Sequence, residues 1–181
     1  MKNYIRYTIF SRHHINNYDQ LWYKLNAVPT QNEIGELGES IFQVAISRDY
    51  IFYPVMLGEK WPSSDFYVEL RDGTDTMFFI VQVKSTIQGV DKYGFLPAQA
   101  TLPKLRELNK YCCPTYVAAV DINKEEVYMV AVNGTVSARI SKFPTTFKLD
   151  AANRQKLYKD VETFWKGSGI KAYKNSFTHS I

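Results

Sequence analysis

Hydrophobic residues recur every three or four positions between residues 31 and 48, the spacing that gathers them on one face of an α-helix. Thr30 and Glu33 stand at the start of this stretch in the order of a capping box, whose hydroxyl and carboxylate satisfy backbone donors of the first turn. The pattern predicts a helix that packs on the rest of the domain through its apolar face. The residues expected on that face are Ile34, Leu37, Gly38, Ile41, Phe42 and Ala45.

Three segments after this helix carry the aromatic and branched residues typical of β-strands. They are YIFYPVML at residues 50–57, DFYVEL at 65–70 and TMFFIVQVK at 76–84. The sequence Asp72-Gly73 between the last two segments is a strong turn signal. We therefore expect these two strands to pair as an antiparallel hairpin.

The second half of the chain mixes helical and strand patterns. Residues 102–111 predict a helix with Pro103 in its first turn, and residues 151–166 predict another. Between them, TYVAAVDI is a near-continuous apolar run typical of a central strand covered on both faces, and EEVYMVAV repeats the pattern. A helix between strands suggests a crossover. The chain is thus expected to form an α/β fold in which helices flank a mixed central sheet.

Composition narrows the choice of partner and compartment. The 181 residues suit one domain, and 45% hydrophobic with 22% charged residues is ordinary for a globular protein. A net charge of +4 is compatible with a polyanionic partner. Cys112 and Cys113 are adjacent, so they offer neither a disulfide framework nor spaced zinc ligands, and no apolar stretch reaches the length of a membrane span. We expect a cytoplasmic protein with no membrane partner; a homodimer stays open.

Three polar residues stand where the predicted hairpin would bring them together. Gln82 and Lys84 lie two positions apart on one strand, so their side chains share a face, and Asp65 begins the partner strand. Carboxylate and amide oxygens are hard ligands of the kind that Mg²⁺ prefers. Asp65 and Gln82 could therefore bind a cation, while Lys84 orients water or stabilises charge on a phosphate.

At these residues the sequence resembles the PD-(D/E)XK nuclease superfamily, in the branch with glutamine in place of the second acid, as in methyl-directed restriction endonucleases. The resemblance rests on GELGES at 35–40, PSSDFYVEL at 62–70 and FIVQVKST at 79–86. Holliday-junction resolvases of the superfamily also place a glutamate on the first helix, four residues after a glycine, and this pattern falls on Gly35 and Glu39.

The resemblance implies a restriction-endonuclease-like fold and an endonuclease that acts on DNA with Mg²⁺ or Mn²⁺. Its catalytic residues would be Asp65, Gln82, Lys84 and Glu39, and all of these except Lys84 would bind the metal. Glu36 is the alternative to Glu39, but it lies nearly opposite the apolar face, whereas Glu39 lies nearer its edge. The nuclease-like core would span about residues 30–130 of a single domain, with an N-terminal arm at 1–29 and a helical extension at 131–181.

Other functions fit the same residues. A neutral Gln82 weakens cation binding, so the protein could be a nucleic-acid-binding module that no longer cuts. It could also be a structural protein, a reading that an ion pair between Asp65 and Lys84 would favour. Ser85 and Thr86 offer hydroxyls to a phosphate but also suit an ordinary strand end. A basic face on the second helix competes with a plain solvated surface; its residues are Lys104, Arg106 and Lys110.

Overall fold

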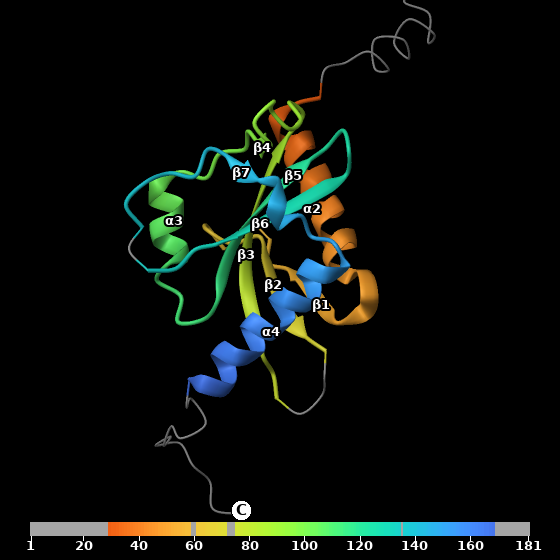
Figure 1. Ribbon diagram of the computed structural model, residues 1–181. Coiled ribbons are helices and arrows are strands. Elements are labelled where there is room, and N and C mark those ends of the chain that lie inside the picture. The colour runs from red at the N-terminus through yellow and green to blue at the C-terminus, as the bar shows by residue number, and fades with distance from the viewer. Residues whose placement is uncertain (1–28, 59–60, 72–74, 135, 169–181) are drawn as a thin grey trace, which may run out of the picture. The chain divides into compact units, whose positions relative to one another are not determined.

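A computed structural model describes residues 29–58, 61–71, 75–134 and 136–168 (Figure 1). The chain divides after Thr30 into two units, and the description below concerns the second, residues 31–181. The predicted arm at residues 1–29 lies outside the described part except for its last residue.

The centre of the fold is a five-stranded sheet in the order β1-β2-β3-β5-β6. β3 and β5 are parallel, and the other neighbouring strands are antiparallel. The mixed sheet confirms the predicted fold class and is compatible with a restriction-endonuclease-like fold. The strands are β1 (Phe52–Met56), β2 (Phe66–Leu70), β3 (Phe78–Thr86), β5 (Thr115–Asp121) and β6 (Glu126–Ala131).

Three helices flank the sheet, and a two-stranded ribbon adds a second, smaller sheet (Figure 1). The predicted crossover helix is α3, which ends three residues earlier than expected. The helices are α2 (Gln31–Ser47), α3 (Leu102–Leu108) and α4 (Ala151–Gly167). The ribbon pairs β4 (Phe95–Leu96) with β7 (Phe143–Pro144), and two short 3-10 helices lie at Arg48–Tyr50 and Thr145–Phe147.

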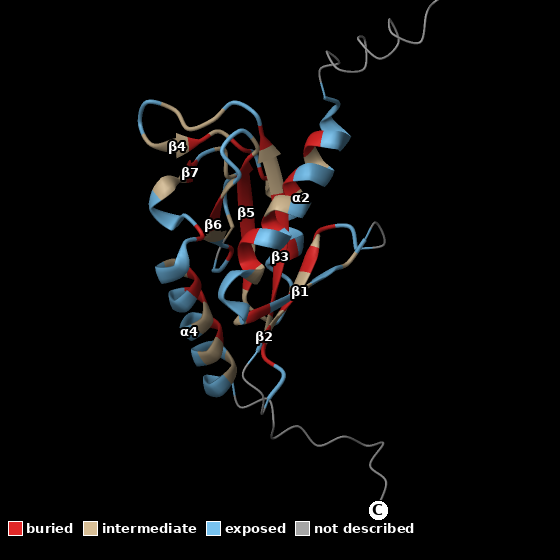
Figure 2. Ribbon diagram, turned by 90° about the vertical axis from the view of Figure 1, so that its right-hand side faces the viewer, coloured by how far each residue is buried: buried red, intermediate tan, exposed pale blue. Residues whose placement is uncertain are grey.

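The sheet separates two hydrophobic cores. One core joins α2 and α4 to the sheet and includes Phe42, Phe79 and Val161. The other lies on the α3 side and includes Ile80 and Leu105. Figure 2 shows β3 and β5 coloured as buried along most of their length, whereas α4 presents an exposed outer face. Burial on both faces explains the continuous apolar run that predicted β5.

The alternation of side chains along β3 decides where the polar residues of this strand lie. Phe79, Val81 and Val83 belong to the core under α2 and α4, whereas Ile80 belongs to the core on the α3 side. Since successive side chains of a strand point to opposite faces, Gln82 and Lys84 share the face of Ile80. Both therefore lie on the α3 side of the sheet.

One prediction about the first helix is wrong. Leu37 was expected on the buried face of α2, but 49% of it is exposed. The buried face is rotated toward Ile46, which is fully buried although the predicted stripe did not include it. Leu37 is therefore turned away from the sheet, and the same rotation brings the edge of the buried face nearer to Glu39.

The last helix is fixed at both ends by polar contacts. The Asp150 side chain caps α4 by accepting a hydrogen bond from the backbone of Asn153 at 2.9 Å. Near the other end, the Trp165 indole donates to the Phe78 carbonyl at 2.7 Å. The buried guanidinium of Arg154 binds the Asp49 carboxylate at 2.7 Å. These contacts hold α4 against the sheet and against the end of α2.

Candidate functional site

Asp65 is anchored to the strand that carries the other predicted residues. Its carboxylate accepts a hydrogen bond from the backbone N–H of Val83 at 2.6 Å. Its own N–H donates to the Val81 carbonyl at 2.9 Å, and its carbonyl accepts from Leu57. The chain just before β2 is thus held between β1 and β3, and Asp65 lies beside the part of β3 that bears Gln82 and Lys84.

Gln82 is almost completely buried and only partly satisfied. Its exposed fraction is 2%, and its Nε2 donates to the Ser63 carbonyl at 3.2 Å. This bond fixes the orientation of the amide, because the reverse orientation would set two oxygens against each other. Among the described residues, Oε1 has no hydrogen-bond partner. A buried acceptor without a partner is costly, so this oxygen could accept a hydrogen bond or bind a cation.

Lys84 is half-buried, and both negative and positive side chains act on its ammonium. Burial lowers the pKa of Lys84, Asp65 raises it, the ammonium of Lys104 lowers it and Glu39 raises it, so that the net shift is downward. The described residues hold no ion pair between Asp65 and Lys84. The ammonium is therefore near the carboxylate without being neutralised by direct contact.

Glu39 joins this cluster from α2. Burial raises the pKa of Glu39, the negative charge of Asp65 raises it further, and Lys84 lowers it. Its side chain is half-buried, whereas Glu36 is exposed. Of the two glutamates considered, Glu39 is the one whose pKa is shifted by the charges of Asp65 and Lys84. The structure thus brings Glu39, Asp65 and Lys84 together near the carboxyl end of β3, with Gln82 buried beside Asp65.

A glycine next to Glu39 sets how closely α2 approaches the sheet. A Cβ atom on Gly38 would lie 1.7 Å from Oγ of Ser85 and 2.7 Å from its Cβ. No side chain other than hydrogen fits there, so Gly38 allows the helix to cross the end of β3. Ser85 therefore lies beneath α2, on the face opposite Lys84.

The two hydroxyl residues after Lys84, Ser85 and Thr86, contact neighbouring parts of the fold. Ser85 is packed against α2, and Thr86 accepts a hydrogen bond from the backbone of Gln88 at 3.1 Å through Oγ1. For Thr86 this contact suits the ordinary strand end. The buried Oγ of Ser85 has no hydrogen-bond partner among the described residues, so its role as a phosphate donor stays a prediction.

The donor set of this cluster fits a hard divalent cation. Among the described residues, no group of three or more His, Cys, Asp and Glu side chains could hold a metal. The third oxygen would have to come from Gln82, whose Oε1 has no other partner in the described part of the chain. A cation would also relieve the repulsion between Asp65 and Glu39. Mg²⁺ keeps several waters, so two carboxylates and one amide suffice.

Of the three basic residues predicted on the second helix, Lys104 and Arg106 lie in α3 and Lys110 follows its end. Among these described residues, Lys104 alone takes part in the cluster. Its ammonium donates to the Pro62 carbonyl and acts on Lys84 through its charge. Lys110 instead pairs with Glu107 at 2.6 Å, and Arg106 is exposed. Lys104 is thus a candidate phosphate ligand. The sequence left a basic face and a solvated surface as alternatives for this residue and could not predict its partner, because the contact joins segments far apart in the chain.

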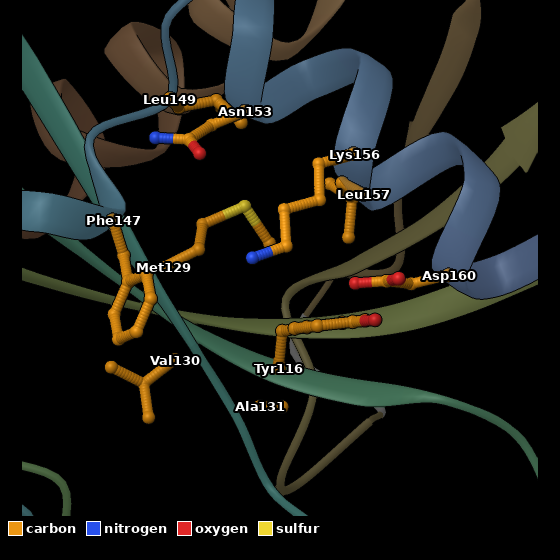
Figure 3. Close-up of a pocket in the computed structure, with 10 residues that line it drawn as sticks. All are labelled: Tyr116, Met129, Val130, Ala131, Phe147, Leu149, Asn153, Lys156, Leu157 and Asp160. Carbon is orange, nitrogen blue, oxygen red and sulfur yellow. The ribbon is translucent and has the colours of Figure 1, made fainter.

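A separate cavity lies between α4 and strands β5 and β6 (Figure 3). Figure 3 shows Met129 and the amine of Lys156 pointing into it, above Tyr116. Burial and the charge of Asp160 raise the pKa of Tyr116 to about 12. The cavity opens on the α4 side of the sheet, and none of the residues that line it belongs to the cluster around Asp65.

Comparison with models of known protein families gives no match to this sequence, and comparison with curated proteins gives none either. In the part of the chain that the structure describes, no helix is both long and apolar enough to cross a membrane.

Proposed function

We propose that the protein is a divalent-metal-dependent nuclease that hydrolyses phosphodiester bonds of DNA. The observation that carries this proposal is the gathering of Asp65, Glu39 and Lys84 around a buried Gln82 whose Oε1 has no hydrogen-bond partner among the described residues. Two anions, an unpartnered oxygen and an ammonium at one strand end match the needs of phosphodiester hydrolysis.

Each residue has a distinct role in the proposal. Asp65, Glu39 and Gln82 would hold Mg²⁺ or Mn²⁺, which supplies neutralisation of phosphate charge and a more acidic water when bound. Lys84 would hold the attacking water or donate to a phosphate oxygen. Because its pKa is lowered, Lys84 would give up a proton to its surroundings more readily than an ordinary lysine does. Lys104 would bind a neighbouring phosphate.

Membership of the PD-(D/E)XK superfamily is part of the proposal. It is supported by the motifs at Asp65 and Gln82-x-Lys84, together with the order of helix, hairpin, crossover helix and parallel strand. Processing of DNA, or defence against foreign DNA, suits such an enzyme. A cytoplasmic location agrees with the free thiols of Cys112 and Cys113.

A binding module without cutting activity is the second candidate. Among the described residues, two carboxylates lie in the cluster, and the Nε2 of Gln82 already donates to the Ser63 carbonyl. This set binds a cation more weakly than three carboxylates would. A purely structural role has less support, because Asp65 and Lys84 form no ion pair in the described structure.

The test is cleavage of plasmid, linear, single-stranded and branched DNA with Mg²⁺ or Mn²⁺. Wild type should cut, and Asp65→Ala and Lys84→Ala should both be inactive. Calorimetry should show loss of metal binding in Asp65→Ala alone, since Lys84 acts on water or phosphate. Asp160→Ala and Lys159→Ala, on exposed positions of α4, are matched controls that should retain activity.

Cation-dependent DNA binding without cutting would favour the binding module. Absence of cutting, of DNA binding and of metal binding in the folded wild type would overturn both and leave the structural role.

A further inference from the structure

A large aromatic side chain is exposed beside the candidate site. Trp61 lies in the loop between β1 and β2, and 46% of it is accessible to solvent. Its indole stacks beside the ring of Tyr111, with centroids 6.5 Å apart and planes inclined by 24°. Tyr111 follows α3, so the aromatic pair joins the loop to the α3 side of the sheet, the side on which Gln82 and Lys84 lie.

The loop that carries Trp61 also supplies the backbone of the site. The Pro62 carbonyl accepts from Lys104, and the Ser63 carbonyl accepts from Gln82. Trp61 and Asp65 are four residues apart, so their Cα atoms are separated by at most about 14 Å. The indole is therefore placed within reach of a nucleotide that adjoins a phosphate bound at Asp65 and Lys84.

Aromatic faces next to ammonium groups are what proteins use to bind single-stranded nucleic acids. Each unpaired base stacks on a ring, and lysines follow the backbone. Lys84 and Lys104 supply positive charge here, and Trp61 with Tyr111 supplies the rings. In a continuous duplex the bases are stacked on one another and could not reach a protruding indole without being extruded.

We propose that Trp61, supported by Tyr111, stacks an unpaired nucleobase next to the cleavage point. The substrate class is then DNA with unpaired nucleotides at that point, such as single strands, overhangs and branched ends. This inference rests on the proposed function, because it takes DNA as the ligand of the neighbouring site. An apolar protein partner is the competing occupant of the same aromatic pair.

The test is binding of fluorescently labelled DNA in EDTA, where cleavage plays no part, followed by anisotropy. Trp61→Ala should weaken binding of single-stranded DNA by about 5- to 150-fold, the range for loss of one stacked base. Trp61→Phe retains a ring and should recover most of the affinity. Binding of a blunt duplex should change less than twofold. Phe147→Ala removes an equally exposed ring (47%) near α4 and is the matched control.

The inference is overturned if Trp61→Ala binds single strands as wild type does, or if single-strand and duplex affinities fall together. It is also overturned if folded wild type binds no unpaired DNA, the result expected for a protein partner. The proposed function fails separately. If Trp61→Ala loses single-strand binding but wild type never cuts DNA, the proposed nuclease activity is wrong and the stacking role stands. If wild type cuts DNA but Trp61→Ala binds single strands normally, the stacking role is wrong and the nuclease activity stands.

Discussion

The Asp65 carboxylate accepts a 2.6 Å hydrogen bond from the backbone N–H of Val83, the residue that separates Gln82 from Lys84. One side chain thus ties the start of β2 to the end of β3, and its charge also acts on Glu39 and Lys84. Asp65 has two tasks that can be separated, one as a hydrogen-bond acceptor and one as an anion.

Substitutions of Asp65 should separate these tasks. Asp65→Ala leaves the Val83 N–H without its acceptor and should lower the free energy of unfolding by about 1–3 kcal/mol. Asp65→Asn keeps an acceptor oxygen, so it should lose less than half of that amount while still losing metal binding and cleavage. Urea unfolding in EDTA and calorimetric Mn²⁺ titration measure the two effects. Equal stability losses for both variants would contradict the acceptor role.

The contact between Gly38 and Ser85 predicts a sharp difference between two glycines of α2. Gly38→Ala places a methyl group 1.7 Å from Ser85 Oγ and should cost about 1–3 kcal/mol of unfolding free energy. Gly35→Ala meets no atom within 4 Å and should instead stabilise the helix by up to about 1 kcal/mol. Thermal or urea unfolding followed by circular dichroism measures both.

A second substitution checks that the clash is the cause. Ser85→Gly removes both Oγ and Cβ from beneath the helix, so it should restore much of the stability lost in Gly38→Ala. Ser85→Ala should restore less, because its Cβ still lies 2.7 Å from the added methyl group. If neither change restores stability, the close approach of α2 to β3 does not explain the requirement for glycine.

The sequence predicted the parts of this site that depend on local periodicity. Alternation along a strand placed Gln82 and Lys84 on one face, and the Asp72-Gly73 turn signal gave the antiparallel pairing of β2 and β3. The turn itself, at residues 72–74, lies outside the described residues. Periodicity could not predict which side of the helix faces the sheet. Leu37, predicted on the buried face, is therefore exposed.

Contacts between distant segments also escaped prediction. Lys104 approaches the site because α3 packs where its ammonium meets the Pro62 carbonyl, and nothing in LPKLREL indicates this partner. The place of Glu39 depends likewise on the contact of Gly38 with Ser85. The sequence-based predictions did not include Arg154, which is buried against Asp49. The catalytic roles of Asp65, Gln82, Lys84 and Glu39 remain predictions.

Glu39 should make stability depend on pH. Its pKa is raised by burial first, then by Asp65 and Glu36, while Lys84 lowers it. Between the ordinary value of 4.5 and the raised value, the folded protein holds this proton more tightly than the unfolded chain does. Stability therefore falls as pH rises through that window, and ionised Glu39 is destabilising at neutral pH.

Glu39→Gln should accordingly stabilise the metal-free protein at neutral pH, and the gain should vanish below pH 4.5, where Glu39 is protonated in both states. Urea unfolding in EDTA at both pH values measures this, with Asp160→Asn at an exposed position of α4 as the control. Added Mn²⁺ should reverse the order, because the Glu39 carboxylate binds a cation more strongly than the neutral amide of the variant does. A gain that does not depend on pH would contradict the electrostatic explanation.

The last prediction concerns the neutral ligand. Gln82→Glu puts a third carboxylate beside Asp65 and Glu39 at a position that is 2% exposed, and it removes the donor to the Ser63 carbonyl. Without metal, this variant should unfold at a lower temperature than wild type, since a buried charge gains no partner. With Mg²⁺ or Mn²⁺ it should bind the cation more tightly than wild type, and its melting temperature should rise by more.

Cleavage then separates the two leading candidates for function. If wild type is a working nuclease with a weakly charged site, Gln82→Glu should keep or raise cutting at low Mg²⁺. If wild type is inactive and the variant cuts, the protein is a binding module that lacks only the second acid. Gln82→Met, of similar length but without charge or oxygen, should lose the metal-dependent rise in melting temperature. Should Gln82→Glu remain destabilised at every cation concentration, Gln82 does not face a metal, and the cluster around Asp65 is a structural feature of the sheet end.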